Sequence, residues 1–103
     1  RQVPLSAQVR EDAVMLIRAT RPGESIAPDG VRRYVRYGAS VRASQFLCLA
    51  GKARALMAGR YHVTGEDLRA LALPVLRHRV LTNYQAESDG KAVDDVLREV
   101  INR

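Results

Sequence analysis

The sequence has few of the residues that mark disulfide frameworks, metal centres and aromatic cores. Its 103 residues include one cysteine, no tryptophan, one phenylalanine and four tyrosines. A single cysteine cannot form an internal disulfide, so a reducing compartment is expected. No Cys/His cluster has the spacing of a zinc site, and no metal site is predicted. Because aromatic residues make up only 5% of the chain against 47% hydrophobic residues, the core should be mostly aliphatic.

Long apolar runs and targeting segments are also missing. No stretch is long enough to cross a membrane, and the opening Arg-Gln-Val-Pro-Leu-Ser lacks the apolar region of a signal peptide. The first residue is arginine, not methionine, which suggests a fragment of a longer protein. The length supports one domain with a modest core. We therefore interpret residues 1–103 as a single domain of a longer chain, whose other domain lies upstream.

Charge of one sign predominates. The net charge of +6 indicates an acidic partner, such as a nucleic acid, a nucleotide or an acidic protein surface. The positive residues are spread along the chain and do not form one basic block. This distribution favours a solvated surface over a dedicated nucleic-acid stripe, and leaves both open.

Apolar residues recur at helical spacing along nearly the whole chain, and no segment alternates with period two. The spacing predicts long helices over about 6–20 and 41–58, and a short helix after Asp29. Two more are predicted, one beginning at Thr64 and a last one from about Val93. The fold class is therefore all-α, a small helical bundle of roughly five helices.

Several residues are expected to begin or end these helices. Ser6 and Ser40 are candidate N-caps, and Gly38 and Gly59 are candidate C-terminal glycines. Residues 64–67, Thr-Gly-Glu-Asp, have the pattern of a capping box.

Further features concern the helix interiors and the last helix. Pro74 falls inside a helical pattern, where it should kink or divide the helix. Cys48 lies in an apolar run and is interpreted as a small core residue. The last helix should be capped by Ser88, Asp89 or Gly90. The apolar stripe of the helix over 41–58 is predicted to comprise Phe46, Leu47, Ala50, Ala53 and Met57.

The run Gly-Ala-Ser-Val-Arg-Ala at residues 38–43 is the most informative in the chain. With Ser40 as the cap, Arg42 lies in the first turn among backbone N–H groups that have no helical partner. A cation is unfavourable there because the helix dipole already makes that end positive. A bound phosphate would reverse the argument, since the N–H groups, the dipole and the guanidinium would all attract it. The run indicates either an anion site or a solvated surface arginine.

No self-contained active site is found in the sequence. It has no Gly-rich phosphate loop of the Walker A kind. His62 and His78 have no acid or nucleophile partner at helical spacing. Glu66 and Asp67 are better explained by helix capping than by acid–base chemistry.

A second basic run consists of Arg77, His78 and Arg79. Three consecutive side chains spread around more than half of a helix, so they cannot all bind one small ligand. They either complement the negative end of a helix or contact another subunit or domain.

Seven runs occur along the chain in a recognisable order: Arg18–Arg21, Tyr34–Ala43, Lys52–Leu56, Gly59–Arg60, Val63–Asp67, Val75–Arg79 and Asn83–Tyr84. In this order they resemble the C-terminal helical lid of a MoxR-type AAA+ ATPase. The resemblance implies that Arg42 is the sensor 2 arginine, which reaches from the lid to the γ-phosphate of ATP on a separate core. It implies support of the nucleotide site by Gly38, Ala39, Ser40 and Ala43.

The resemblance also sets expectations for the parent protein. ATP and Mg²⁺ would be bound mainly by the core domain. The parent would be a cytoplasmic ATPase, assembled as a homo-oligomeric ring and commonly a hexamer. It would remodel client proteins or assist metal-cofactor maturation, with partners that carry von Willebrand factor A domains and no membrane contact. Arg77, His78 and Arg79 would contact a neighbouring subunit. Where the family has proline this chain has Val41, which should make the helix start less rigid.

Two alternatives stay open at this point. A free-standing basic module could bind nucleic acid through Arg32, Arg33 and Arg36 beside Tyr34 and Tyr37. Such a module would bind duplex DNA with a steep salt dependence, whereas a lid would show little affinity at moderate salt. A passive docking domain would give Arg42 no role.

Overall fold

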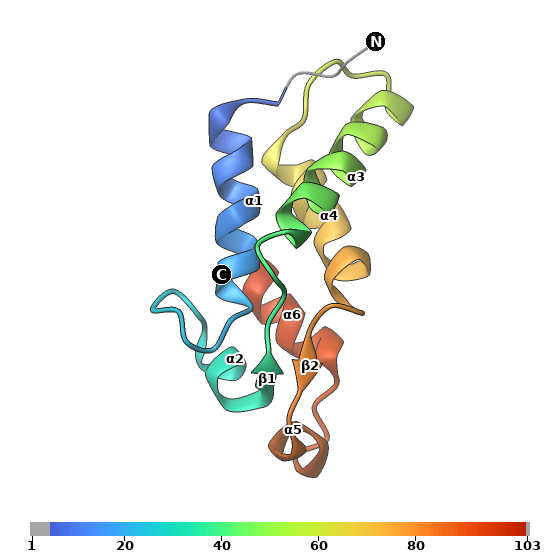
Figure 1. The fold of residues 1–103 in the computed structure, drawn as a ribbon. Coiled ribbons are helices and arrows are strands. Elements are labelled where there is room, and N and C mark those ends of the chain that lie inside the picture. Colours follow the sequence, from blue (N-terminus) through green and yellow to red (C-terminus); the bar gives the residue numbers. More distant parts are fainter. Residues whose placement is uncertain (1–4, 103) are drawn as a thin grey trace.

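A computed structural model describes residues 5–102, and this part of the chain forms six helices and one two-stranded sheet (Figure 1). The elements are α1 (Ala7–Ala19), α2 (Asp29–Tyr34), β1 (Val35–Tyr37), α3 (Ala43–Met57), α4 (Gly65–Leu76), β2 (Leu81–Thr82), α5 (Tyr84–Ser88) and α6 (Val93–Ile101). The predicted all-α bundle is confirmed, with the short α5 in addition to the expected helices. No helix in the described part is long and apolar enough to cross a membrane.

The molecule is elongated, measuring 47 × 23 × 21 Å. Figure 1 shows α1, α3 and α4 at one end, the sheet with α2 and α5 at the other, and α6 between them. Two clusters of buried side chains follow this division. One packs α1, α3 and α4 around Leu47 and Leu68, and the other joins α1, α4 and α6 around Ile17, Leu76 and Leu97. Both are mainly aliphatic, as the composition predicts.

The ends of the first long helices follow the sequence signals. The Val9 N–H donates a hydrogen bond of 3.1 Å to Ser6 Oγ, so Ser6 caps α1 as predicted. Gly59 ends α3 with φ at +76°, a left-handed conformation that favours glycine. The next N–H, that of Arg60, donates back to the Ala55 carbonyl at 2.8 Å. This glycine-ended closure turns the chain sharply toward α4.

The predicted capping box at the start of α4 is confirmed, and Asp67 does more than cap. The Thr64 N–H donates to Asp67 Oδ2 at 2.8 Å, and the Asp67 N–H donates to Thr64 Oγ1 at 3.3 Å. The Asp67 side chain is fully buried and also accepts hydrogen bonds from Arg60 and Arg54. The Arg60 hydrogen bonds, with those from Thr64 and Arg54, outweigh burial and hold the Asp67 pKa well below its usual range. This ion-pair cluster joins α3, the turn after it and α4.

The two-stranded sheet was not anticipated from the sequence. β1 and β2 are antiparallel, pairing Val35 with Thr82 and Tyr37 with Leu81. Strands of three and two residues are too short to show an alternating pattern. The prediction that Gly38 closes the preceding helix is wrong, because α2 ends at Tyr34 and the chain continues as an extended strand.

The apolar stripe predicted for α3 is also mostly wrong. Of its five residues only Leu47 is fully buried, whereas Phe46 and Met57 are 47% and 90% exposed. The buried face of α3 consists of Ala43, Ser44, Leu47, Gly51 and Ala55. Small residues on this face let α3 approach α4 closely, since a Cβ on Gly51 would lie 3.4 Å from a methyl group of Leu68 on α4. Cys48 is partly buried and packs beside this face.

Pro74 lies inside α4, two residues before the helix ends at Leu76, and it does not divide the helix. The predicted cap of the last helix needs correction. α6 begins after Ala92, whose N–H donates to Asp95 at 3.0 Å, and none of the predicted residues caps it. Gly90 has φ at +69° and instead follows the end of α5.

We expect Asp67→Asn to lower the free energy of unfolding by about 2–3 kcal/mol, because two arginines lose a buried anionic partner. Urea unfolding of the domain would measure the change. Glu66→Gln is the matched control, since Glu66 lies in the same first turn and is exposed. Equal effects of the two substitutions would contradict a special role for Asp67.

The stabilisation from Asp67 should depend on pH in a defined direction. The folded-state pKa of Asp67 is lowered, so the unfolded chain takes up a proton at a higher pH than the folded chain. The contribution of ionised Asp67 to the free energy of unfolding is therefore complete above about pH 5. It is lost as the pH falls below about 4, the ordinary pKa of an aspartate. The stability difference between wild type and Asp67→Asn should shrink there by up to about 1.4 kcal/mol per pH unit. A difference that stays constant from pH 6 to pH 2.5 would contradict this.

Candidate functional site

The loop that leads from β1 into α3 is fixed to the end of α1 by Thr20. This fully buried threonine donates its hydroxyl hydrogen to the Ile17 carbonyl at 2.6 Å. The same Oγ1 accepts the Ala39 N–H at 3.0 Å. Ala39 is itself only 1% exposed. One side chain therefore connects the C-terminal end of α1 to the residue that lies three positions before Arg42.

Gly38 allows this close approach. A Cβ on Gly38 would lie 2.7 Å from the Cα of Arg21 and equally close to the carbonyl carbon of Thr20. Backbone atoms cannot move aside as a flexible side chain can, so any larger residue would push the loop away from α1. The requirement for glycine here is one of space and not of positive φ.

The start of α3 differs from the sequence prediction. Arg42 occupies the N-cap position with φ −58° and ψ −28°, and no side chain caps the helix. Ser40 does not act as the cap, because a cap side chain serves N–H groups two or three residues on, and the Ala43 N–H already donates to the Ser40 backbone carbonyl at 2.9 Å. Arg42 nevertheless lies at the N-terminal end of α3, as predicted.

Arg42 is exposed, and its side chain has no hydrogen bond or ion pair with any residue in the 5–102 range. The backbone N–H groups of Val41 and Arg42 likewise donate no hydrogen bond within that range. An exposed guanidinium thus stands beside open N–H groups at the positive end of a 15-residue helix. This arrangement can bind an anion such as a phosphate oxygen.

The predicted supporting residues divide between surface and interior. Ala39 and Ala43 are buried, with 1% and 2% exposure, and Ser40 is exposed. Ala39 and Ala43 therefore hold the loop and the start of the helix against the core.

The fold directs the three residues of the second basic run, Arg77, His78 and Arg79, to different surroundings. Arg77 Nε and Nη2 donate to the two carboxylate oxygens of Asp94, both at 2.9 Å, which joins the end of α4 to the first turn of α6. This pairing lowers the pKa of Asp94. His78 is exposed. The Arg79 guanidinium lies 4.7 Å from the centre of the Phe46 ring, which belongs to the second turn of α3. Sequence reasoning missed this contact because it joins two distant segments.

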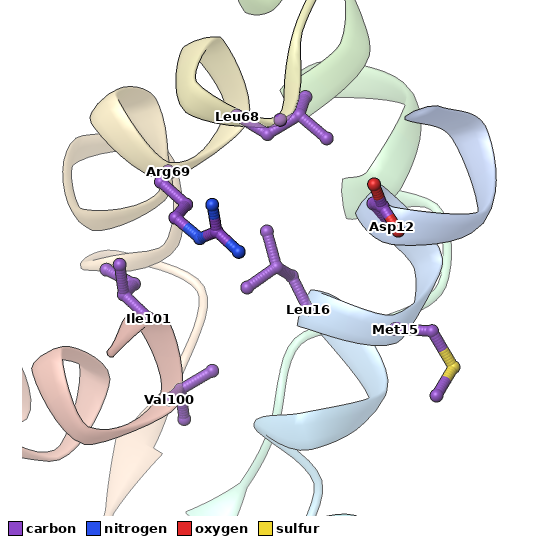
Figure 2. Close-up of a pocket in the computed structure, with 8 residues that line it drawn as sticks. Asp12, Met15, Leu16, Leu68, Arg69, Val100 and Ile101 are labelled. Atoms are coloured by element: carbon purple, nitrogen blue, oxygen red, sulfur yellow. The ribbon is translucent and has the colours of Figure 1, made fainter. Parts of the chain in front are cut away.

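A cavity of about 250 Å³ lies between α1, α4 and α6 (Figure 2). None of its lining residues belongs to α3. Its titratable side chains are Asp12 and Arg69, and Figure 2 shows Leu16 pointing into the space between them. His62 lies elsewhere, exposed in the loop before α4. No group of three or more His, Cys, Asp or Glu residues that could hold a metal ion occurs within the described residues.

The residues of the nucleic-acid alternative are only partly available. Arg32 donates to the Ser25 carbonyl at 2.8 Å and lies 3.9 Å from Asp29. The guanidinium groups of Arg33 and Arg36 lie within 6 Å of the adjacent tyrosine rings.

The fold and the open start of α3 define a small helical domain that presents the exposed Arg42 at a helix N-terminus. Residues 29–100 match the family model of the AAA lid domain. The chain belongs to this family and is the lid domain of a MoxR-type AAA+ ATPase.

Two relatives support the assignment. Chaperone MoxR1 of Mycobacterium tuberculosis is 34% identical over 88 residues, which cover 85% of this chain and 23% of that protein. The crystal structure of a candidate ATPase from Cytophaga hutchinsonii matches with a TM-score of 0.90 at 30% identity. That match covers 98% of this chain and 31% of the other. The chain thus spans less than a third of the length of each of these relatives.

We expect Gly38→Ala to destabilise the domain by about 1–3 kcal/mol, because the added methyl group meets the backbone of Thr20 and Arg21. Gly23→Ala is the control, since a Cβ at Gly23 has nothing within 4 Å. Urea unfolding of both variants would measure the difference. A Gly38→Ala variant as stable as Gly23→Ala would show that the loop is not held tightly against α1.

Proposed function

We propose that Arg42 is the sensor 2 arginine of the ATPase and contacts the γ-phosphate of ATP held by the core domain of the parent protein. The observation that carries the proposal is the exposed Arg42 side chain, without an ion-pair partner among residues 5–102, next to the open N–H groups at the start of α3. Val41 adds an N–H group at this end that a proline would lack.

Phosphoryl transfer places negative charge on the oxygens of the transferred group, so a fixed guanidinium lowers the barrier. Fixing the guanidinium requires a rigid support. The Thr20–Ala39 hydrogen bond and the packing of Gly38 on α1 provide that support in the lid. Rotation of the lid as one body would then bring Arg42 toward the phosphate or withdraw it.

Magnesium is assigned to the core domain. Mg²⁺ prefers carboxylate oxygens, and residues 38–46 around the start of α3 contain neither aspartate nor glutamate. The residues present here fit the phosphate and not the metal. When ATP and Mg²⁺ are bound, this chain supplies the positive charge of Arg42 and the N–H groups beside it.

We propose a cytoplasmic parent ATPase that forms a homo-oligomeric ring, commonly a hexamer in this family, and remodels client proteins or assists metal-cofactor maturation. Partners with von Willebrand factor A domains belong to the same proposal. Support comes from the relationship to a protein named as a chaperone. The exposed His78 and the Phe46-bound Arg79 are available to a neighbouring subunit, whereas Arg77 is paired with Asp94.

In the full-length ATPase, Arg42→Ala should lower the turnover of ATP by about 10²-fold, the usual effect of removing one donor from a developing anion. Arg33→Ala is the charge-matched control and should retain wild-type turnover, since Arg33 lies on α2. Size-exclusion chromatography would establish that both variants still fold and assemble. Wild-type turnover in both variants would refute the sensor assignment.

A further inference from the structure

A groove lies between the turn that follows α1 and the end of β1. It has a volume of about 390 Å³ and is lined by residues 21–24 and 36–38. Two exposed arginines contribute to it, Arg21 from the turn and Arg36 from the strand. Arg42 is not among its lining residues. We call it the basic groove.

The two sides of the basic groove are held together by the backbone. The Cα of Arg21 lies so close to Gly38 that a Cβ on that glycine would approach it to 2.7 Å. The Glu24 N–H donates to the Arg21 carbonyl at 3.1 Å, which closes a tight turn over Pro22 and Gly23. Arg21 therefore keeps its place relative to β1, and a ligand that binds both arginines requires little ordering of the backbone.

The basic groove has an excess of positive charge. In the part of the chain that the structure describes, the guanidinium groups of Arg21 and Arg36 have no hydrogen bond or ion pair. The acidic lining residue Glu24 is already engaged, because Arg18 Nε and Nη2 donate to its Oε1 at 3.1 and 2.8 Å. Two uncompensated guanidinium groups in one groove attract carboxylates, each of which can accept two hydrogen bonds from one arginine.

An exposed apolar pair continues the surface of the groove across the sheet. Tyr37 lines the groove and pairs with Leu81 on β2, and the two side chains are 59% and 61% exposed. Residues paired across two antiparallel strands share a face of the sheet, so their side chains form one apolar surface. Covering that surface with an apolar side chain of a ligand is favourable.

These features favour an acidic protein segment over a nucleic acid. The Arg36 guanidinium lies 5.3 Å from the centre of the Tyr37 ring, so it already occupies one face on which a base would stack. The neighbouring Arg32 is engaged by the Ser25 carbonyl at 2.8 Å. Affinity for a nucleic acid grows with the number of phosphates contacted, and two arginines make few contacts. A peptide with carboxylates and an apolar side chain uses the arginines and the Tyr37–Leu81 pair together.

We propose that the basic groove binds a short acidic segment of a partner protein. Carboxylates of the segment contact Arg21 and Arg36, and an adjacent apolar side chain packs on Tyr37 and Leu81. The inference goes beyond the proposed function and does not depend on the role of Arg42. A groove of this size holds a few side chains, which corresponds to a transient contact with a short peptide and not to a permanent interface.

Fluorescence anisotropy with the full-length ATPase tests the proposal. The probe is a fluorescein-labelled peptide of sequence Gly-Glu-Glu-Leu-Glu-Glu-Leu-Gly, and a second peptide has glutamine at each glutamate position. Titrations contain ADP and Mg²⁺, which keep the nucleotide site occupied. The ionic strength is about 0.15 M, at which exposed charges more than about 8 Å apart are largely screened.

We expect saturable binding of the glutamate peptide by the wild type. Arg21→Gln and Arg36→Gln should each raise the dissociation constant about tenfold, because each removes charge-assisted hydrogen bonds. Arg10→Gln is the matched control and should bind like the wild type, since the exposed Arg10 on α1 does not line the groove. Absence of saturable binding, an equal loss in Arg10→Gln, or equal affinity for the glutamine peptide would overturn the proposal.

A DNA duplex of about 20 base pairs is the competitor that distinguishes an acidic protein segment from a nucleic acid. Unlabelled glutamate peptide should displace the labelled probe, whereas the duplex at the same concentration should not. Displacement of the probe by the duplex would overturn the proposal in favour of a nucleic acid.

The apolar part of the contact is tested by a separate substitution. Leu81→Ser should raise the dissociation constant of the glutamate peptide about fivefold, because part of an apolar contact is lost. Tyr84→Ser is the control, since Tyr84 is 80% exposed and lies on α5, outside the groove. An unchanged constant in Leu81→Ser, or an equal change in Tyr84→Ser, would overturn the placement of the segment beside the sheet.

Peptide binding also separates this inference from the sensor assignment. Arg42→Ala should bind the glutamate peptide like the wild type, whatever its turnover of ATP. Loss of peptide binding in Arg42→Ala would overturn the proposal, because the acidic segment would then lie at the start of α3. Wild-type turnover in Arg42→Ala together with unchanged peptide binding would refute the sensor assignment alone.

Discussion

The buried carboxylate of Asp67 determines how α3 and α4 meet. Placing a carboxylate inside a protein costs several kcal/mol unless it is paired and hydrogen-bonded. Here it accepts from Arg54 on α3, Arg60 in the following turn and the backbone N–H of Thr64. Each donor comes from a different segment, so the carboxylate fixes the angle and the register of α3 against α4. The glycine-ended turn at Gly59 brings Arg60 into reach.

The other end of α3 is held by different means. There, Thr20 accepts the Ala39 N–H, and Gly38 packs directly on the backbone at the end of α1. With both ends held, α3 cannot tilt independently of the rest of the domain. Arg42 consequently keeps a fixed position relative to the rest of the domain.

Local signals in the sequence predicted the helices, and contacts between distant segments had to come from the structure. Ser6, Gly59 and the Thr64–Asp67 box act within a few residues of themselves, so their patterns were sufficient. The sheet, the Thr20 anchor and the ion pairs of Asp67 join segments far apart, and no spacing rule reveals them. The exposed position of Arg42 at the start of α3 followed from the sequence, although the expected cap at Ser40 did not form.

The failed prediction for α3 is itself informative. Periodicity favoured the row with the largest apolar side chains, including Phe46 and Met57, yet the core side of α3 uses Gly51 and Ala55. Small residues are favoured on the buried face because they allow close approach to α4. Side-chain hydrophobicity alone therefore predicted the wrong face of α3 as the buried one.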